Sequence, residues 1–150
     1  MSGSARQAGL RRHRTRPWFV TLLGLVFIGL GWLFLLAPRA GAVLFGLAPP
    51  EGDAFGYLPA IGLRDLAFGL YLLILSRTAT PRVLALILAA TLVIPIGDLV
   101  IVAAWRGATA MWPLVLHGTS ALVMSGTALW LLFTDLRANR TPHTDTGGIR

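Results

Sequence analysis

The chain has 150 residues, of which 55% are hydrophobic and only 13% are charged, and its mean hydropathy is +0.72. Soluble domains carry about twice that share of charged residues, so the composition excludes an ordinary soluble domain. It also excludes collagen-like, coiled-coil and disordered chains, which leaves an integral membrane protein.

The positive charge of the chain comes entirely from arginine, since its 13 basic residues include no lysine and its net charge is +7. These arginines stand at the ends of apolar stretches and not on a recognisable nucleic-acid readout element, so we expect no nucleic-acid partner. The absence of cysteine excludes disulfides and cysteine-ligated zinc or iron–sulfur clusters.

Four apolar stretches approach the roughly 20 residues that a membrane-spanning helix requires. They are continuous and lack the alternation of barrel strands. The sequence therefore predicts an all-α fold, a polytopic four-transmembrane-helix bundle over residues 17–136, with polar cytoplasmic tails at 1–16 and 137–150. The predicted helices cover residues 18–36, about 57–75, 83–105, and about 111–133.

The connection between the first two predicted helices is the longest outside the membrane. Its first half contains Val43, Leu44, Phe45 and Leu47, and is apolar enough to lie at the membrane interface as a short helix. We expect the Pro49-Pro50 pair to stop that helix, because proline breaks helical hydrogen bonding. The segment should cap the outer face of the bundle.

The distribution of arginine predicts the orientation. Ten arginines fall in the two tails and the second connection, whereas only Arg39 and Arg106 fall on the opposite side. By the positive-inside rule, both termini of a multi-pass plasma-membrane protein are then cytoplasmic. Ala40-Gly41-Ala42 imitates a signal-peptide cleavage site, but the apolar run before it exceeds the 7 to 15 residues of a cleaved signal, so we expect the first helix to be retained.

Four ionisable side chains lie well within the apolar stretches: Arg64, Asp65, Asp98 and His117. A charge at the bilayer centre costs about 2.5 to 3.5 kcal/mol on insertion scales, so such residues face the bundle interior and have partners. At a rise of about 1.5 Å per residue, all four lie roughly 9 to 12 Å from the outer ends of their helices. Three helices thus place these groups at one level in the outer half of the bilayer.

The four residues permit two interpretations. Arg64 with Asp98 or Asp65 could form an interhelical ion pair that fixes the packing, with His117 hydrogen-bonded beside it. Alternatively the four could surround a functional pocket. A metal site from Asp65, Asp98 and His117 lacks any paired-histidine spacing, and no nucleotide or dinucleotide motif is present, so we expect neither a metal nor a cofactor.

Three segments in order carry a family resemblance: GLRDLAFGLYLLIL from Gly62, PIGDLVIV from Pro95 and HGTSALVM from His117. Over about residues 18–134 the chain resembles the small four-helix membrane family catalogued as domain-of-unknown-function family 4267. The resemblance implies a four-helix bundle with polar groups from helices two, three and four, and no established activity. A looser likeness to DoxX-type membrane proteins adds none.

The sequence leaves two classes of function open. The favoured one is a structural or accessory membrane subunit, or a small carrier, whose polar cluster organises the bundle. The alternative is a membrane-embedded isomerase or cyclase for a lipophilic small molecule, with His117 and Asp98 as acid and base, Arg64 holding an oxyanion and Asp65 positioning Arg64. The glycines of the first helix also suggest a homo-oligomer. An enzyme should have an apolar cavity beside the four side chains, whereas an accessory protein should have them packed solid.

Overall fold

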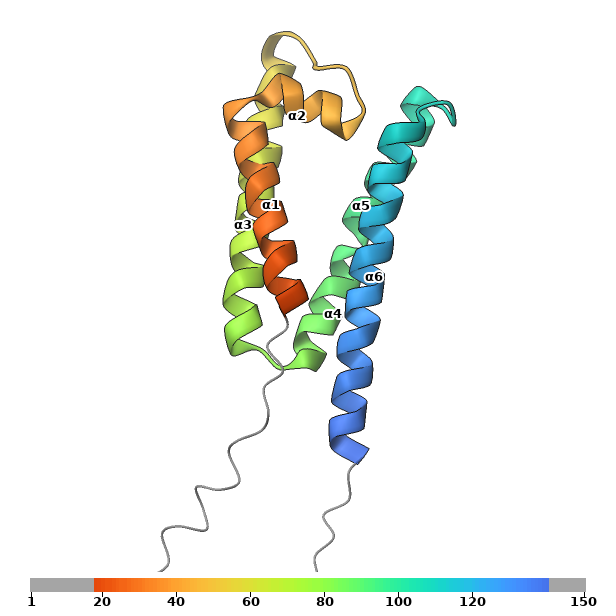
Figure 1. The fold of residues 1–150 in the computed structure, drawn as a ribbon. Helices are drawn as coiled ribbons and strands as arrows, with labels where there is room; N and C mark the ends of the chain where they lie inside the picture. Colours follow the sequence, from red (N-terminus) through yellow and green to blue (C-terminus); the bar gives the residue numbers. More distant parts are fainter. Residues whose placement is uncertain (1–17, 141–150) are drawn as a thin grey trace, which may run out of the picture.

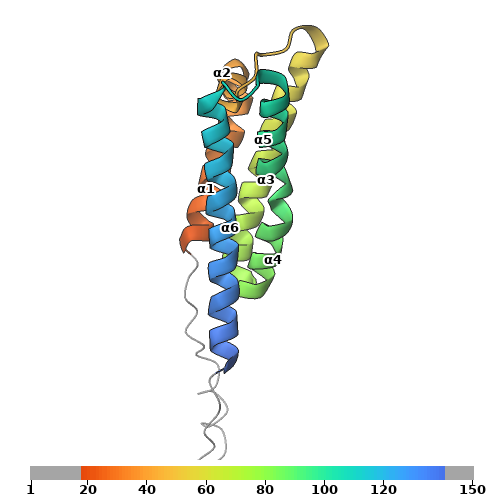
Figure 2. The same ribbon diagram turned by 90° about the vertical axis from the view of Figure 1, so that its right-hand side faces the viewer.

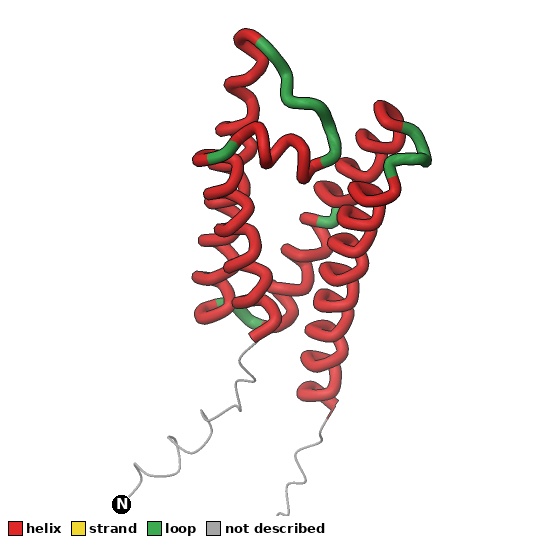
Figure 3. Tube along the Cα trace, turned by 45° about the horizontal axis from the view of Figure 1, so that its top comes forward, coloured by secondary structure: helices red, strands yellow, loops and turns green. Residues whose placement is uncertain are grey.

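The computed structural model describes residues 18–140, which form helices joined by short connections and include no strand (Figure 3). The predicted tail at 1–16 and residues 141–150 of the second predicted tail lie outside the described residues. The elements in chain order are α1 (Trp18–Leu36), α2 (Pro38–Phe45), the 3-10 helix η2 (Gly52–Gly56), α3 (Tyr57–Thr78), α4 (Pro81–Thr91), α5 (Val93–Arg106) and α6 (Met111–Arg140).

Four helical stretches of the described chain are long and apolar enough to cross a membrane: α1, η2 with α3, α4 with α5, and α6. They run alternately up and down (Figure 1). The chain is therefore a multi-pass membrane protein with an all-α fold, as predicted. Two helices extend past their predicted ends, α3 to Thr78 and α6 to Arg140, so residues 137–140 of the predicted tail are helical.

The third predicted helix, residues 83–105, is not continuous but breaks at Leu92 into α4 and α5. Proline has no N–H, so Pro95 leaves the carbonyl of Thr91 without its helical donor. In addition, the hydroxyl of Thr91 donates to the carbonyl of Ile87 at 2.7 Å, and a hydrogen bond of this kind commonly bends helices. Just after the break, Pro95 is buried.

Helices α1 and α3 pack closely through glycines. A Cβ atom added to Gly31 would lie 2.8 Å from the carbonyl oxygen of Gly62, and one added to Gly69 would lie 2.7 Å from the carbonyl oxygen of Gly24. Such close backbone approach is how membrane helices gain van der Waals contact in the absence of a hydrophobic driving force. Asp65 lies between the two glycines of α3 on this face and is buried.

The larger of two buried clusters lies at the end of the bundle away from α2, whereas a smaller one, formed by Phe34, Ala42 and Leu58, packs α2 against α1 and α3. Helix α1 packs on α3, and α4 and α5 pack on α6, so the chain forms two halves (Figures 1 and 2). The two halves meet in one cluster of buried side chains, contributed by α1, α3, α4 and α6: Val20, Leu72, Leu84, Ala85, Leu88, Met124, Ala128 and Leu131.

Helix α2 crosses from the end of α1 toward α6 at the opposite end of the bundle (Figure 1). It is the short helix predicted in the first connection, but it ends at Gly46, before the Pro49-Pro50 pair. Gly46 adopts φ of 108°, a left-handed conformation that favours glycine. It also packs on the ring of Pro113 in α6 so closely that a Cβ atom would collide with it. Thus α2 bridges the two halves where they share no core.

Candidate functional site

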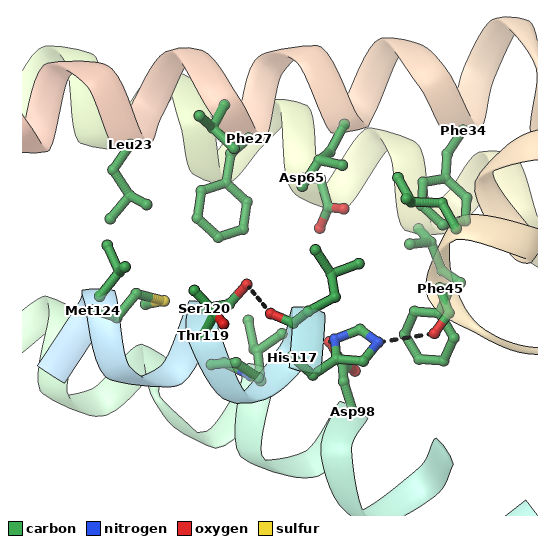
Figure 4. A pocket seen from close by; sticks show the side chains of 18 of the residues that line it. Leu23, Phe27, Phe34, Phe45, Asp65, Asp98, His117, Thr119, Ser120 and Met124 are labelled. Carbon is green, nitrogen blue, oxygen red and sulfur yellow. Dashed lines mark hydrogen bonds and ion pairs between the residues drawn. The ribbon is translucent and has the colours of Figure 1, made fainter. Parts of the chain in front are cut away.

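A cavity of about 350 Å³ lies between the two halves, and all four predicted site residues line it. Arg64 and Asp65 come from α3, Asp98 from α5 and His117 from α6. Most of the other lining side chains are apolar or aromatic and come mainly from α1, α2, α5 and α6, as Figure 4 illustrates for Leu23, Phe27, Phe34, Phe45 and Met124. The four ionisable residues therefore converge on an apolar cavity.

On the α3 side of the cavity, Arg64 pairs with its sequence neighbour. Its Nε and Nη2 atoms donate to Oδ1 of Asp65 at 3.1 and 3.0 Å. The Asp65 side chain is 9% exposed and that of Arg64 49%, so the carboxylate is buried while the guanidinium stays partly open. The bonds occupy one edge of the guanidinium and leave its Nη1 amino group available to an oxygen atom of a ligand.

On the opposite side, His117 lies between two partners from different helices. Its Nε2 atom is 2.8 Å from the backbone carbonyl oxygen of Phe45 in α2, and its Nδ1 atom is 3.8 Å from Oδ2 of Asp98 in α5. The Phe45 ring also meets the imidazole edge-on, with a centroid distance of 4.9 Å. Figure 4 shows this group facing Asp65 across the cavity.

The bond to Phe45 fixes the protonation pattern of the imidazole. A backbone carbonyl can only accept, so Nε2 of His117 carries a hydrogen and donates it. Nδ1 then faces the Asp98 carboxyl group. The distance of 3.8 Å is within ion-pair range but too long for a direct hydrogen bond. The contact is attractive when the imidazole is protonated and Asp98 is ionised.

The structure selects among the pairings that the sequence left open. Arg64 bonds to Asp65 of its own helix and makes no ion pair with Asp98, so the interhelical contact is the one between Asp98 and His117. Among residues 18–140, no three histidine or acidic side chains lie close enough together to hold a metal ion. Every buried side-chain nitrogen and oxygen atom of this region has a hydrogen-bond partner.

Sequence reasoning missed the partner of His117 Nε2. That partner is a backbone carbonyl 72 residues away, and a backbone group carries no residue identity that a pattern could show. The only related signal was the apolar character of the segment around Phe45, which predicted a helix over the end of the bundle.

Comparison with protein families shows a match to the family described as Domain of unknown function (DUF4267), over residues 24–131. The matched region runs from α1 into α6 and includes all four predicted site residues. Searches of curated proteins and of solved structures found no match. Because the family match covers more than half of the chain, this four-helix membrane protein belongs to the DUF4267 family.

Proposed function

We propose that this protein is a membrane-embedded acid–base enzyme that isomerises or cyclises a lipophilic small molecule without a cofactor. The observation that carries the proposal is the 350 Å³ cavity beside the four ionisable side chains. A cluster that served packing alone would fill that space with side chains, because protein interiors are close-packed. An apolar cavity with a few convergent polar groups is the usual form of a small-molecule site.

Asp98 is the proposed acid or base that meets the substrate. Its side chain is 20% exposed and that of His117 only 9%, so the carboxyl group is the more open member of the pair. In the proposed reaction the Asp98 carboxylate takes a proton from a substrate carbon atom, and the His117 imidazole 3.8 Å away accepts that proton in turn. The same pair returns a proton at a second carbon atom, so the molecule is isomerised with no net change in atoms or electrons.

Arg64 is the proposed group that stabilises charge on the substrate. When a proton leaves a carbon atom next to a carbonyl group, negative charge develops on the oxygen atom. Arg64 lines the same cavity, and its Nη1 group, which does not bond to Asp65, would bind that oxygen. Asp65 then acts as a positioning residue, since its two hydrogen bonds fix the plane of the guanidinium.

The proposed membrane placement has both termini in the cytoplasm and α2 on the outer side of the plasma membrane. It is supported by ten arginines, eight near the two chain termini and two, Arg77 and Arg82, in the adjoining ends of α3 and α4, against Arg39 and Arg106 at the other end. In this orientation the cavity lies in the outer half of the bilayer.

Solvent deuterium tests the proposal before any substrate is identified. Wild-type protein in liposomes is incubated with a total lipophilic extract in D2O, and the extract is analysed by chromatography and mass spectrometry. A proton-transfer enzyme should introduce deuterium at carbon in a specific compound. Asp98→Asn and His117→Gln should abolish this incorporation, whereas Glu51→Gln, an exposed acid outside the cavity, should retain it. Equal incorporation by wild type and Asp98→Asn, or none by either, would contradict the proposal.

A further inference from the structure

A second cavity, of about 470 Å³, lies toward the end of the bundle where α2 crosses. Its walls come from α1, α2, α3, α5 and the connection that follows α2. Three side chains line both this cavity and the polar one: Phe34, Phe45 and Ile61. Only these side chains are shared, so the two cavities are neighbours with a common wall.

The order of lining residues along the helices places the cavities end to end. On α3, Leu58 lines the second cavity, Ile61 lines both and Asp65 lines the polar one. On α5, Asp98 lines the polar cavity, and Trp105 and Arg106 line the second. The chain runs in opposite directions in α3 and α5, so both helices place the second cavity on the α2 side of the polar cavity.

Phe45 forms the part of the common wall that comes from α2. Its carbonyl is held by His117 at 2.8 Å and its ring packs against the same imidazole. The side chain is partly buried and packs against the cluster of Phe34, Ala42 and Leu58. One of the three residues that divide the cavities thus contacts the proposed proton-transfer pair.

The second cavity has one charged group, Arg106, among predominantly apolar side chains. Arg106 is exposed at the end of α5 and makes no ion pair within the described chain. A guanidinium binds carboxylate and phosphate groups through two parallel N–H bonds. Trp105 beside it is 75% exposed, as is usual for aromatic side chains at the level of lipid head groups.

We propose that the two cavities together bind one single-chain amphiphile with an anionic carboxylate or phosphate head. Arg106 binds the head, the apolar chain passes Phe45, and a group farther along the chain lies beside Asp98. Asp98 and Arg106 are eight residues apart on α5, so at 1.5 Å per residue that group lies about 12 Å from the head. The nature of the reacting end rests on the proposed function, whereas the binding of the anionic head does not.

The test measures binding of radiolabelled stearate to the full chain in nanodiscs of neutral phosphatidylcholine. Octadecyl phosphate and octadecanol compete as probes with the same chain and a different head. Stearate or octadecyl phosphate should bind about tenfold more tightly than octadecanol, and Arg106→Gln should remove that difference. The better of the two anions identifies the head group as carboxylate or phosphate.

Arg39→Gln is the matched control. Arg39 is a second exposed cation at the same end of the molecule, but it lines neither cavity and lies 5.3 Å from the centroid of the Phe55 ring. Its loss should change the affinity for stearate less than about twofold, as expected of a surface charge. Equal effects of the Arg39 and Arg106 substitutions, or equal affinity for octadecanol and the anions, would overturn the inference.

A substitution at Ile61 tests whether the ligand chain passes from one cavity into the other. Ile61→Trp enlarges a shared wall residue and should reduce the affinity for stearate about tenfold while leaving that for octanoate, which fits within the second cavity, unchanged. Ile61→Phe serves the same purpose if the tryptophan variant does not fold. Unchanged stearate binding in a folded variant would overturn the single-channel arrangement.

The binding and deuterium experiments separate this inference from the proposed function. If Arg106→Gln changes neither stearate binding nor deuterium incorporation, this inference alone is contradicted. If stearate binding depends on Arg106 but no deuterium is incorporated, the enzymatic proposal alone is contradicted.

Discussion

His117 of α6 and Phe45 of α2 are joined twice, by a 2.8 Å hydrogen bond from the imidazole to the backbone carbonyl and by edge-to-face contact of the two rings. These contacts join helices that belong to different halves of the molecule. They lie at the end of the bundle where the two halves share no apolar core. These contacts and that of Gly46 with Pro113 therefore hold the end of α2 against α6.

Replacement of His117 by phenylalanine should therefore release the end of α2. The bond contributes about 1 kcal/mol, and its loss leaves the Phe45 carbonyl without a partner. Hydrogen–deuterium exchange followed by mass spectrometry should show faster exchange of the amides of residues 43–47. Ser120→Ala is the control, because the Ser120 hydroxyl, one turn farther along α6, bonds only to the Leu116 carbonyl. The same exchange in both variants would show that the bond does not hold α2.

The contact between α1 and α3 should depend on glycine at particular positions. Gly31→Ala places a Cβ atom 2.8 Å from the Gly62 carbonyl, and the helices must move apart, which costs about 1 to 3 kcal/mol. Gly29→Ala, two residues away on α1, meets nothing within 4 Å. The melting temperature in detergent should fall for Gly31→Ala and stay constant or rise for Gly29→Ala. A fall of equal size in both would point to helix distortion and not to packing.

Replacement of Arg64 alone should destabilise the protein more than replacement of Arg64 and Asp65 together. Arg64→Gln leaves a buried carboxylate without its partner and should destabilise the protein by about 3 kcal/mol, the lower end of the range for buried pairs because Arg64 is half exposed. The double variant Arg64→Gln/Asp65→Asn removes both charges and should recover much of that loss. Thermal unfolding in detergent measures the stability of the single and double variants. A double variant no more stable than Arg64→Gln would contradict the pairing.

Topology reporters should place the two ends of the bundle on opposite sides of the membrane. A fusion after Arg140 should report the cytoplasm and an insertion near Glu51 the exterior, because ten arginines flank one end of the bundle and two the other. An alkaline phosphatase and a green fluorescent protein fusion at each site give complementary signals. The reverse pattern would move the polar cavity to the inner half of the bilayer.

Much of the fold could be predicted from apolar run length, since the hydrocarbon thickness sets how many apolar residues a spanning helix needs. That rule found all four spans. It could not find the break at Leu92, because a span with one unsatisfied carbonyl is as hydrophobic as an intact one. Pro95 gave the only local signal, and proline also occurs within continuous membrane helices.

The site could be predicted in part. The cost of burying charge singled out Arg64, Asp65, Asp98 and His117, and the structure brings all four to one cavity. Their pairing depended on side-chain reach: the long Arg64 side chain folds onto its neighbour Asp65, although adjacent residues of a helix point in different directions. The cavity itself is a property of how two halves meet, and no residue pattern encodes an empty volume.

The larger buried cluster lies far from α2, and this has a consequence for how a guest molecule enters. The side chains around Leu72 and Leu88 hold the halves together far from α2, so separation of the halves at the α2 end exposes no fully buried core residue of that cluster. Entry then leaves the larger cluster intact and disrupts only contacts near α2, among them the packing of Gly46 near Pro113 and Val102. During binding, the amides of α4 should keep their protection against hydrogen exchange, while the protection of the α2 amides should change. One end of the bundle can thus stay rigid while the other opens locally.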